Sequence, residues 1–184
     1  MRKTISIILF IVFMFTSVAI ALKIGGKVLP DKMKAGENEL LLNGAGLRKK
    51  LIIKVYAGAL YLIQKSSDAK AIIEADEPMA VKMHFIYKSV SPKKLIDAWN
   101  TGFSKSDISN LQEEIKTFNS FFIEDAKKDD IYDIIYIPEE GTSVYMNNEL
   151  KGTISGQEFK KAVFSIWLGE ETELPKLKKA MLGK

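Results

Sequence analysis

The chain has 184 residues, a formal net charge of +4 and no cysteine, which excludes thiol nucleophiles, thiolate-bound zinc and thiol redox chemistry. His84 is the only histidine, so a serine-hydrolase triad or a histidine relay would depend on that residue alone, and a two-histidine metal site lacks its parts. Lysine and glutamate are interspersed instead of forming one concentrated basic face, which argues against nucleic-acid binding. We therefore expect no metal, no other cofactor and no nucleic-acid partner.

The first 21 residues have the three parts of a secretory signal peptide. Arg2 and Lys3 supply the positive end, residues 5–19 are apolar apart from three hydroxyl side chains, and Ala19 and Ala21 are the small residues that a signal peptidase requires. The alternative is an uncleaved anchor, but the run is at or below the lower end of the roughly 20 apolar residues that cross a bilayer. We expect cleavage after Ala21, a mature domain over 22–184, a periplasmic or secreted location, and no other membrane segment.

Strand patterns dominate the first half of the mature chain. Short strands are expected at 23–29 and 39–43, and a long one at 50–63, whose two alternating faces are both largely apolar. Such a strand should be central in its sheet and covered on both sides. The Asn-Gly-Ala-Gly stretch at 43–46 is expected to be a turn before it, since a phosphate-binding loop would lead into a helix.

The next strand, 80–88, alternates between apolar and polar residues. This alternation places His84 on the more polar face beside Lys82, where we expect a solvated histidine. The acidic pairs at 129–130 and 139–140 are expected to be solvated as well.

Helix start signals then follow at three places. Ser91 and Pro92 supply an N-cap and a first-turn proline, while Ser109 with Gln112 and Ser155 with Glu158 form possible capping boxes.

Between the second and third of these helices, strands are expected at 131–138, 142–146 and 150–154, with a hairpin turn at 147–148. A last short helix is expected before Gly183. The order of strands, helices, strands and helices predicts an α+β fold, with a largely antiparallel sheet and helices grouped on one face.

Arg48 and Tyr56 are the candidate binding residues. Arg48 is the only arginine after Arg2, and its planar fork suits a carboxylate or a delocalised oxyanion better than a lysine does. Tyr56 places a hydroxyl among apolar neighbours in the long strand, where a buried phenol requires a partner. The alternative is that Arg48 pairs with a surface acid and Tyr56 is an ordinary core residue. Residue types alone leave both interpretations open.

Four segments resemble the chalcone isomerase superfamily, and most of all the bacterial chalcone isomerase-like domains that carry a signal peptide. The segments are Leu42–Arg48, Lys54–Leu62, Ala98–Phe103 and Ser165–Gly169. The resemblance covers essentially the whole mature chain. It implies an open-faced β-sandwich, in which a large antiparallel sheet carries helices on one face and a ligand cleft lies between them.

The resemblance also implies roles for single residues. Arg48 falls where the plant isomerases have an arginine that stabilises a phenolate oxygen. Tyr56 falls where they have a threonine and where fatty-acid-binding relatives have a tyrosine that, with the arginine, holds the ligand carboxylate. Tyr87 is the nearest candidate for a further isomerase tyrosine, whereas Pro92 and Lys93 fall where an asparagine is expected.

These observations predict an exported, non-catalytic binding domain for a small amphipathic or acidic, fatty-acid-like ligand, with Arg48, Tyr56 and Tyr87 in the binding cleft. One alternative is an intramolecular lyase of the chalcone isomerase type that uses Arg48 as oxyanion stabiliser. Another is an interaction or scaffold protein of the cell envelope.

Overall fold

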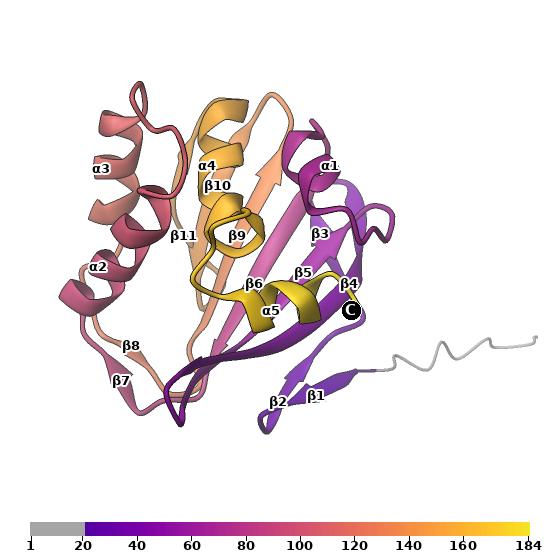
Figure 1. The fold of residues 1–184 in the computed structure, drawn as a ribbon, viewed down its shortest axis with the longest axis vertical. Helices are drawn as coiled ribbons and strands as arrows, with labels where there is room; N and C mark the ends of the chain where they lie inside the picture. Colours follow the sequence, from indigo (N-terminus) through magenta and orange to yellow (C-terminus); the bar gives the residue numbers. More distant parts are fainter. Residues whose placement is uncertain (1–20) are drawn as a thin grey trace, which may run out of the picture.

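The computed structural model describes residues 21–184, so the predicted signal peptide lies outside the described residues except for Ala21. The centre of the fold is a seven-stranded antiparallel sheet in the order β11-β10-β9-β6-β5-β4-β3 (Figure 1). Its strands are β3 (Lys32–Ala35), β4 (Asn38–Lys50), β5 (Ile53–Leu62), β6 (Met79–Phe85), β9 (Ile131–Ile137), β10 (Gly141–Met146) and β11 (Glu149–Ile154). Two small antiparallel pairs join β1 (Leu22–Ile24) to β2 (Lys27–Leu29) and β7 (Ser89–Val90) to β8 (Ala126–Lys127).

The helices gather on one side of this sheet (Figure 1). They are α1 (Ala69–Glu74), α2 (Pro92–Phe103), α3 (Gln112–Ser120), α4 (Gln157–Leu168) and α5 (Pro175–Met181). Within residues 21–184, no helix is both long and apolar enough to cross a membrane. The predicted α+β fold, an antiparallel sheet with helices on one face, is confirmed.

Both faces of β5 are buried, as its sequence predicted. Alternate residues such as Tyr56 and Leu60 enter the main core beneath the helices. The residues between them, among them Ala57 and Tyr61, enter a second core on the opposite face, which Leu29 from β2 helps to cover.

The turn predicted at 43–46 is wrong, because β4 continues through this segment to Lys50 and the chain reverses only at Leu51 and Ile52. The glycines serve the close approach of α5 to the sheet. A Cβ atom on Gly44 would overlap the carbonyl oxygen of Ala180, and one on Gly46 would lie 2.7 Å from the Ala180 Cβ. The small residues therefore form a seat for a helix.

The expected capping boxes are also corrected. The helix α3 begins after Leu111 and α4 begins after Gly156, and neither helix has a side-chain cap. Ser91 does precede α2, with Pro92 in the first turn, although its side chain makes no capping bond. The predicted hairpin turn between β10 and β11 is confirmed at residues 147–148, where both asparagines have positive φ, as the two-residue turn requires.

The packing of α5 on the glycine seat is open to a direct test. We expect Gly46→Ala to lower the free energy of unfolding by about 2 kcal/mol, because the new methyl group overlaps the Ala180 methyl group in a closely packed contact. Ala180→Gly alone costs about 1 kcal/mol of helix propensity. In the double variant the cost of Gly46→Ala should fall by half or more, as measured by urea unfolding. Strictly additive costs would show that α5 is not seated on Gly46.

Candidate ligand-binding site

The structure brings Arg48 and Tyr56 together as directly opposed residues of β4 and β5. Opposed residues of an antiparallel pair point to the same face of the sheet. Tyr56 belongs to the core beneath the helices, and Gly44 and Gly46, on alternate positions before Arg48, contact α5. Arg48 thus lies on the helix-covered face of the sheet, next to the glycines that contact α5 and at the edge of the main core.

Tyr56 is joined to the helix layer by one hydrogen bond. Its side chain is 5% exposed, and its hydroxyl oxygen accepts a hydrogen bond of 3.0 Å from the indole Nε1 of Trp167 in α4. Burial raises the pKa of Tyr56 to about 12, although the Trp167 bond and the nearby Arg48 charge both favour the ionised form. The phenol is therefore neutral at physiological pH, and its proton has no acceptor among the side chains and backbone of residues 21–184.

The segments that resemble the chalcone isomerase superfamily meet around this bond. Trp99 of α2 packs edge-on against Trp167, with ring centroids 5.6 Å apart. Gly102 permits the contact of α2 with α4, since a Cβ atom there would lie 2.8 Å from Ile166. The Nε1 of Trp99 is buried and has no hydrogen-bond partner within the described chain. Two buried donors beside Trp167, the Tyr56 hydroxyl and the Trp99 indole, thus have no acceptor within the described chain.

Arg48 is half-buried, and its Nη1 donates a hydrogen bond of 2.8 Å to the carbonyl oxygen of Lys49. None of the ion pairs within residues 21–184 includes Arg48. The alternative in which Arg48 pairs with a surface acid thus has no support in the described chain. The remaining donors of its guanidinium are available to an oxyanion.

Tyr87 lies close to this pair in the connection between β6 and β7. Its backbone N–H donates to the carbonyl oxygen of Val55, the residue before Tyr56, at 3.1 Å. Its side chain is half-buried and makes no hydrogen bond within residues 21–184. Pro92 and Lys93 form the first turn of α2, where Lys93 pairs with Asp97 at the surface.

Among the hollows on the described part of the molecule are two that lie elsewhere and are not lined by Arg48, Tyr56 or Tyr87. One, of about 640 Å³, lies between α1, the end of α4 and the end of the chain, and its lining mixes lysines with acids. The other, of about 410 Å³, lies on the opposite face of the sheet beside the buried ion pair of Lys82 and Asp133, whose closest N···O distance is 2.6 Å. The side chains of the main core lie beneath the helices.

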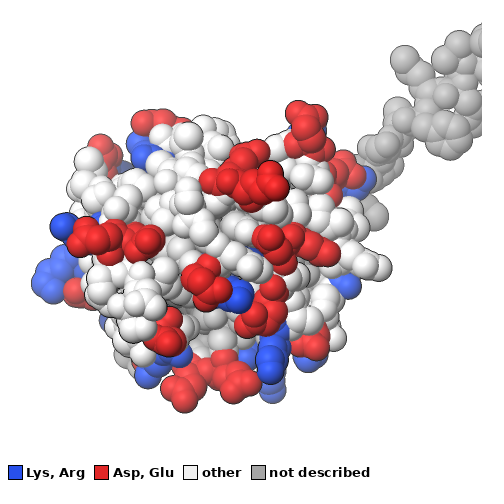
Figure 2. Space-filling model, turned by 90° about the horizontal axis from the view of Figure 1, so that it is seen from above, with Lys and Arg blue, Asp and Glu red and all other residues white. Residues whose placement is uncertain are grey.

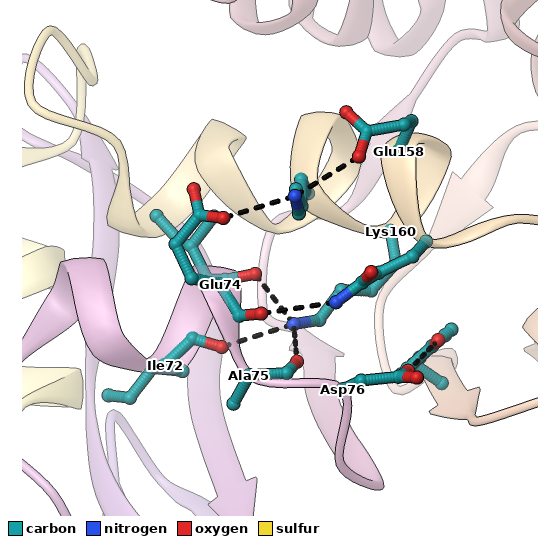
Figure 3. A network of polar contacts seen from close by, with 10 residues as sticks. Ile72, Glu74, Ala75, Asp76, Glu158 and Lys160 are labelled. Carbon is teal, nitrogen blue, oxygen red and sulfur yellow. Dashed lines mark hydrogen bonds and ion pairs between the residues drawn. The ribbon is translucent and has the colours of Figure 1, made fainter.

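Lys160 is a buried cation that the sequence analysis did not single out (Figure 3). Its Nζ donates to the carbonyl oxygens of Ile72, Ile73 and Ala75 at 3.1, 2.7 and 2.5 Å. These carbonyls end α1, where the helix dipole favours a positive charge. Burial lowers the pKa of Lys160 to about 8, against nearby acids that raise it. Because three carbonyls take its three protons, Lys160 is a cap for α1 and not a free amine for chemistry.

The expectation of a solvated His84 is corrected. Its side chain is half-buried and its Nδ1 is buried without a partner in the described residues. Burial, followed by the charge of Lys27, lowers the pKa of this histidine. Asp129 is not simply solvated either, because it pairs with Lys27 from β2. These residues hold the β1–β2 hairpin over the sheet, on the face opposite the helices.

An antiparallel sheet with helices on one face is the arrangement expected of a chalcone isomerase-like fold. A family model described as "Chalcone isomerase-like" matches residues 21–183, so the chain belongs to the chalcone isomerase-like family. A search of curated proteins finds no match. Among solved structures, the chain is similar to a fatty-acid binding protein of Arabidopsis thaliana, with a TM-score of 0.73, 17% identity, and coverage of 89% of this chain and 96% of that chain.

The Lys160 cap predicts a specific stability defect. Lys160→Met should lower the free energy of unfolding by about 2 kcal/mol at neutral pH, because three buried carbonyls lose their donor. Because the pKa of Lys160 is lower in the folded chain, this amine binds fewer protons in the folded than in the unfolded chain between pH 8 and 10.5. The contribution of Lys160 to the free energy of unfolding therefore rises with pH in that window. The deficit of the variant should therefore grow as the pH is raised, as measured by urea unfolding at several pH values.

Lys161→Met is the matched control, because Lys161 makes surface ion pairs with Glu74 and Glu158. Such pairs contribute about 0–1 kcal/mol. An equal loss in both variants, independent of pH, would contradict the capping role of Lys160.

Proposed function

We propose that the chain is an exported, non-catalytic binding protein for a small amphipathic molecule with an acidic group. In this proposal Arg48 and Tyr56 hold the acidic group, Tyr87 borders it, and the apolar tail lies between the sheet and the helices. Such a division between a few polar anchors and an apolar lining is usual for a small-molecule site.

The observation that carries the proposal is the unused hydrogen-bonding capacity of the opposed Arg48 and Tyr56. A buried phenol normally satisfies its proton, and a guanidinium on the helix-covered face normally finds an acid. A ligand carboxylate would accept from both, in the charge-assisted geometry for which arginine is suited. The buried Nε1 of Trp99, which also lacks an acceptor in the described chain, supports an oxygen-bearing guest near Trp167.

The fold comparison supports the same ligand class. The similar Arabidopsis thaliana protein is a fatty-acid binding protein. Tyr56 is the residue type that the resemblance associates with carboxylate binding rather than with isomerase chemistry. We therefore favour a fatty-acid-like ligand over a flavonoid.

Isomerase activity is less well supported. The resemblance requires an asparagine near the start of a helix, and this chain has Pro92 and Lys93 at the start of α2. Proline has no backbone N–H and no polar side chain, and Lys93 is directed to a surface ion pair. The carboxamide that an isomerase site needs is thus missing from this position.

Binding of a fluorescent fatty acid tests the proposal. We expect saturable binding by the chain from residue 22 onward, which contains both cores. Tyr56→Phe should weaken the affinity about tenfold, because the variant lacks the phenol hydroxyl that donates a hydrogen bond to the charged carboxylate. Arg48→Ala should weaken the affinity more, and Arg48→Lys should restore only part of the loss, since lysine cannot make bidentate hydrogen bonds to a carboxylate.

Two further measurements complete this experiment. The methyl ester of the same fatty acid should bind equally to wild type and Arg48→Ala, because the ester carries no charge for Arg48 to hold. Affinity for the free acid that is unchanged by both substitutions would overturn the proposed site. Ring closure of a chalcone above the rate in buffer, lost in Arg48→Ala, would overturn the non-catalytic assignment.

Export is part of the proposal and has its own test. The first described strand, β1, begins at Leu22, so a cut after Ala21 would leave every helix and strand of residues 21–184 in the released chain. We expect the chain expressed with its full N-terminus in a bacterial host to be recovered outside the cytoplasm with Leu22 as its first residue, by N-terminal sequencing. Replacing Ala19 and Ala21 by leucine should block the cut. Recovery of an intact Met1 in the cytoplasm would contradict export.

A further inference from the structure

The turn between β4 and β5 exposes an apolar tip. Leu51 is 93% exposed and Ile52 is 94% exposed, and Ile53 beside them is 43% exposed. Large apolar residues occur singly on most protein surfaces, but here three are consecutive in the chain at the end of a hairpin. We call residues 49–54 the β4–β5 tip.

The tip is not explained by the needs of the turn. Lys50 and Ile53 are paired, so Leu51 and Ile52 form a two-residue hairpin turn. Such turns favour asparagine and glycine, because they require a positive φ. Leu51 nevertheless has a φ of +55°, which costs a residue with a branched side chain about 1 kcal/mol or more. Strain of this kind, with no burial in return, indicates a role outside the folding of the hairpin.

Charge around the tip is exclusively positive along the chain. Lys49, Lys50 and Lys54 are exposed and flank the apolar residues, and none of them forms an ion pair within residues 21–184. No acidic residue occurs between Glu39 and Asp68. The exposed apolar residues are complementary to the apolar interior of a bilayer, and the lysines that flank them in the chain are complementary to anionic headgroups.

The opposite end of the molecule is rich in acidic side chains, whereas the end with the tip has its lysines together with Asp129 and Asp130, which precede β9. The turn at β4–β5 projects at the lower end in Figure 1, and the connection from α1 to β6 and the turn from β9 to β10 lie at the far end of the antiparallel strands. Acidic side chains occupy those two connections, namely Asp76, Glu77, Glu139 and Glu140, and Glu74 lies at the end of α1 beside them. Figure 2, seen from above, shows this end, on which acidic groups predominate. An anionic surface would therefore repel this end and attract the tip.

We propose that the β4–β5 tip docks the protein on a bilayer that contains anionic lipid, with Leu51 and Ile52 inserted below the headgroups and the three lysines among the phosphates. A second copy of the chain is a poorer occupant, because a symmetric contact between two tips would bring like charges together. The surface is separate from the proposed ligand contacts of Arg48 and Tyr56, and its test leaves both residues intact.

Sedimentation with lipid vesicles tests the docking. The chain from residue 22 onward should bind vesicles of phosphatidylglycerol and phosphatidylcholine, bind pure phosphatidylcholine weakly, and lose binding as salt is raised. Of the two turn residues only Leu51 has a positive φ, a pattern that favours glycine at the first position. Leu51→Gly with Ile52→Asn should therefore keep the fold, and it should lower the partition coefficient at least about tenfold. Each Lys→Gln change at 49, 50 or 54 should lower it about fivefold.

Ile123→Asn is the matched control, because Ile123 is 78% exposed but is followed by Glu124 and Asp125. It should bind vesicles as wild type does. Vesicle binding that survives the double turn substitution, or that falls equally in Ile123→Asn, would overturn the proposal. So would a tip-dependent dimer in sedimentation velocity with no vesicle binding. Fatty-acid affinity in solution should not change in the tip variants, so failure of docking is distinguishable from failure of the ligand site.

Discussion

The hydrogen bond from Trp167 to Tyr56 is the interaction on which the rest of this structure depends. It joins β5, an interior strand of the sheet, to the helix α4 through two groups that are both buried. Breaking it would leave a buried indole donor without an acceptor, at a cost of about 1–3 kcal/mol. Because the bond uses the phenol oxygen as acceptor, it fixes the orientation of the ring and leaves the phenol proton directed elsewhere. One interaction therefore both closes the core and sets up the candidate site.

The glycines of β4 and β5 explain why the candidate site lies where it does. Gly44, Gly46 and Gly58 lack side chains on the helix-covered face, and α5 occupies the space that this leaves. A helix backbone so close to the sheet leaves no room there for a guest. Arg48 and Tyr56 are the first residues beyond these glycines with large side chains on the helix-covered face. They lie where the sheet faces α2 and the end of α4. The position of the arginine–tyrosine pair is thus a consequence of how α5 is packed.

Features that arise from local pattern could be predicted from the sequence. The two apolar faces of β5 follow from its alternation, the start of α2 from Ser91 and Pro92, and the hairpin at residues 147–148 from its two asparagines. The family segments also identified Arg48 and Tyr56 as a pair before their opposed register was known. In these cases the information lies within a few residues, or in a motif that the family retains.

Features that depend on distant partners could not be predicted in the same way. Gly44 looks like a turn residue until Ala180 is known to lie against it. Lys160 looks like one of many surface lysines, because the carbonyls it caps come from a helix almost ninety residues earlier in the chain. His84 alternates onto a polar face, yet the β1–β2 hairpin partly covers it. Glycine, lysine and histidine each have several common uses, and tertiary contacts decide among them.

The tip and the arginine–tyrosine pair belong to one hairpin, and this links the two proposals physically. Arg48 precedes Leu51 by three residues, a distance of about 10 Å along an extended strand. Insertion of Leu51 to the level of the upper acyl chains would thus place Arg48 near the headgroup phosphates and carboxylates. An amphipathic acid that left the bilayer headgroup-first would then meet a guanidinium at the level of the headgroups. A strained, apolar turn is costly for a protein that only stores its ligand in solution, but it is useful to one that takes the ligand from a membrane.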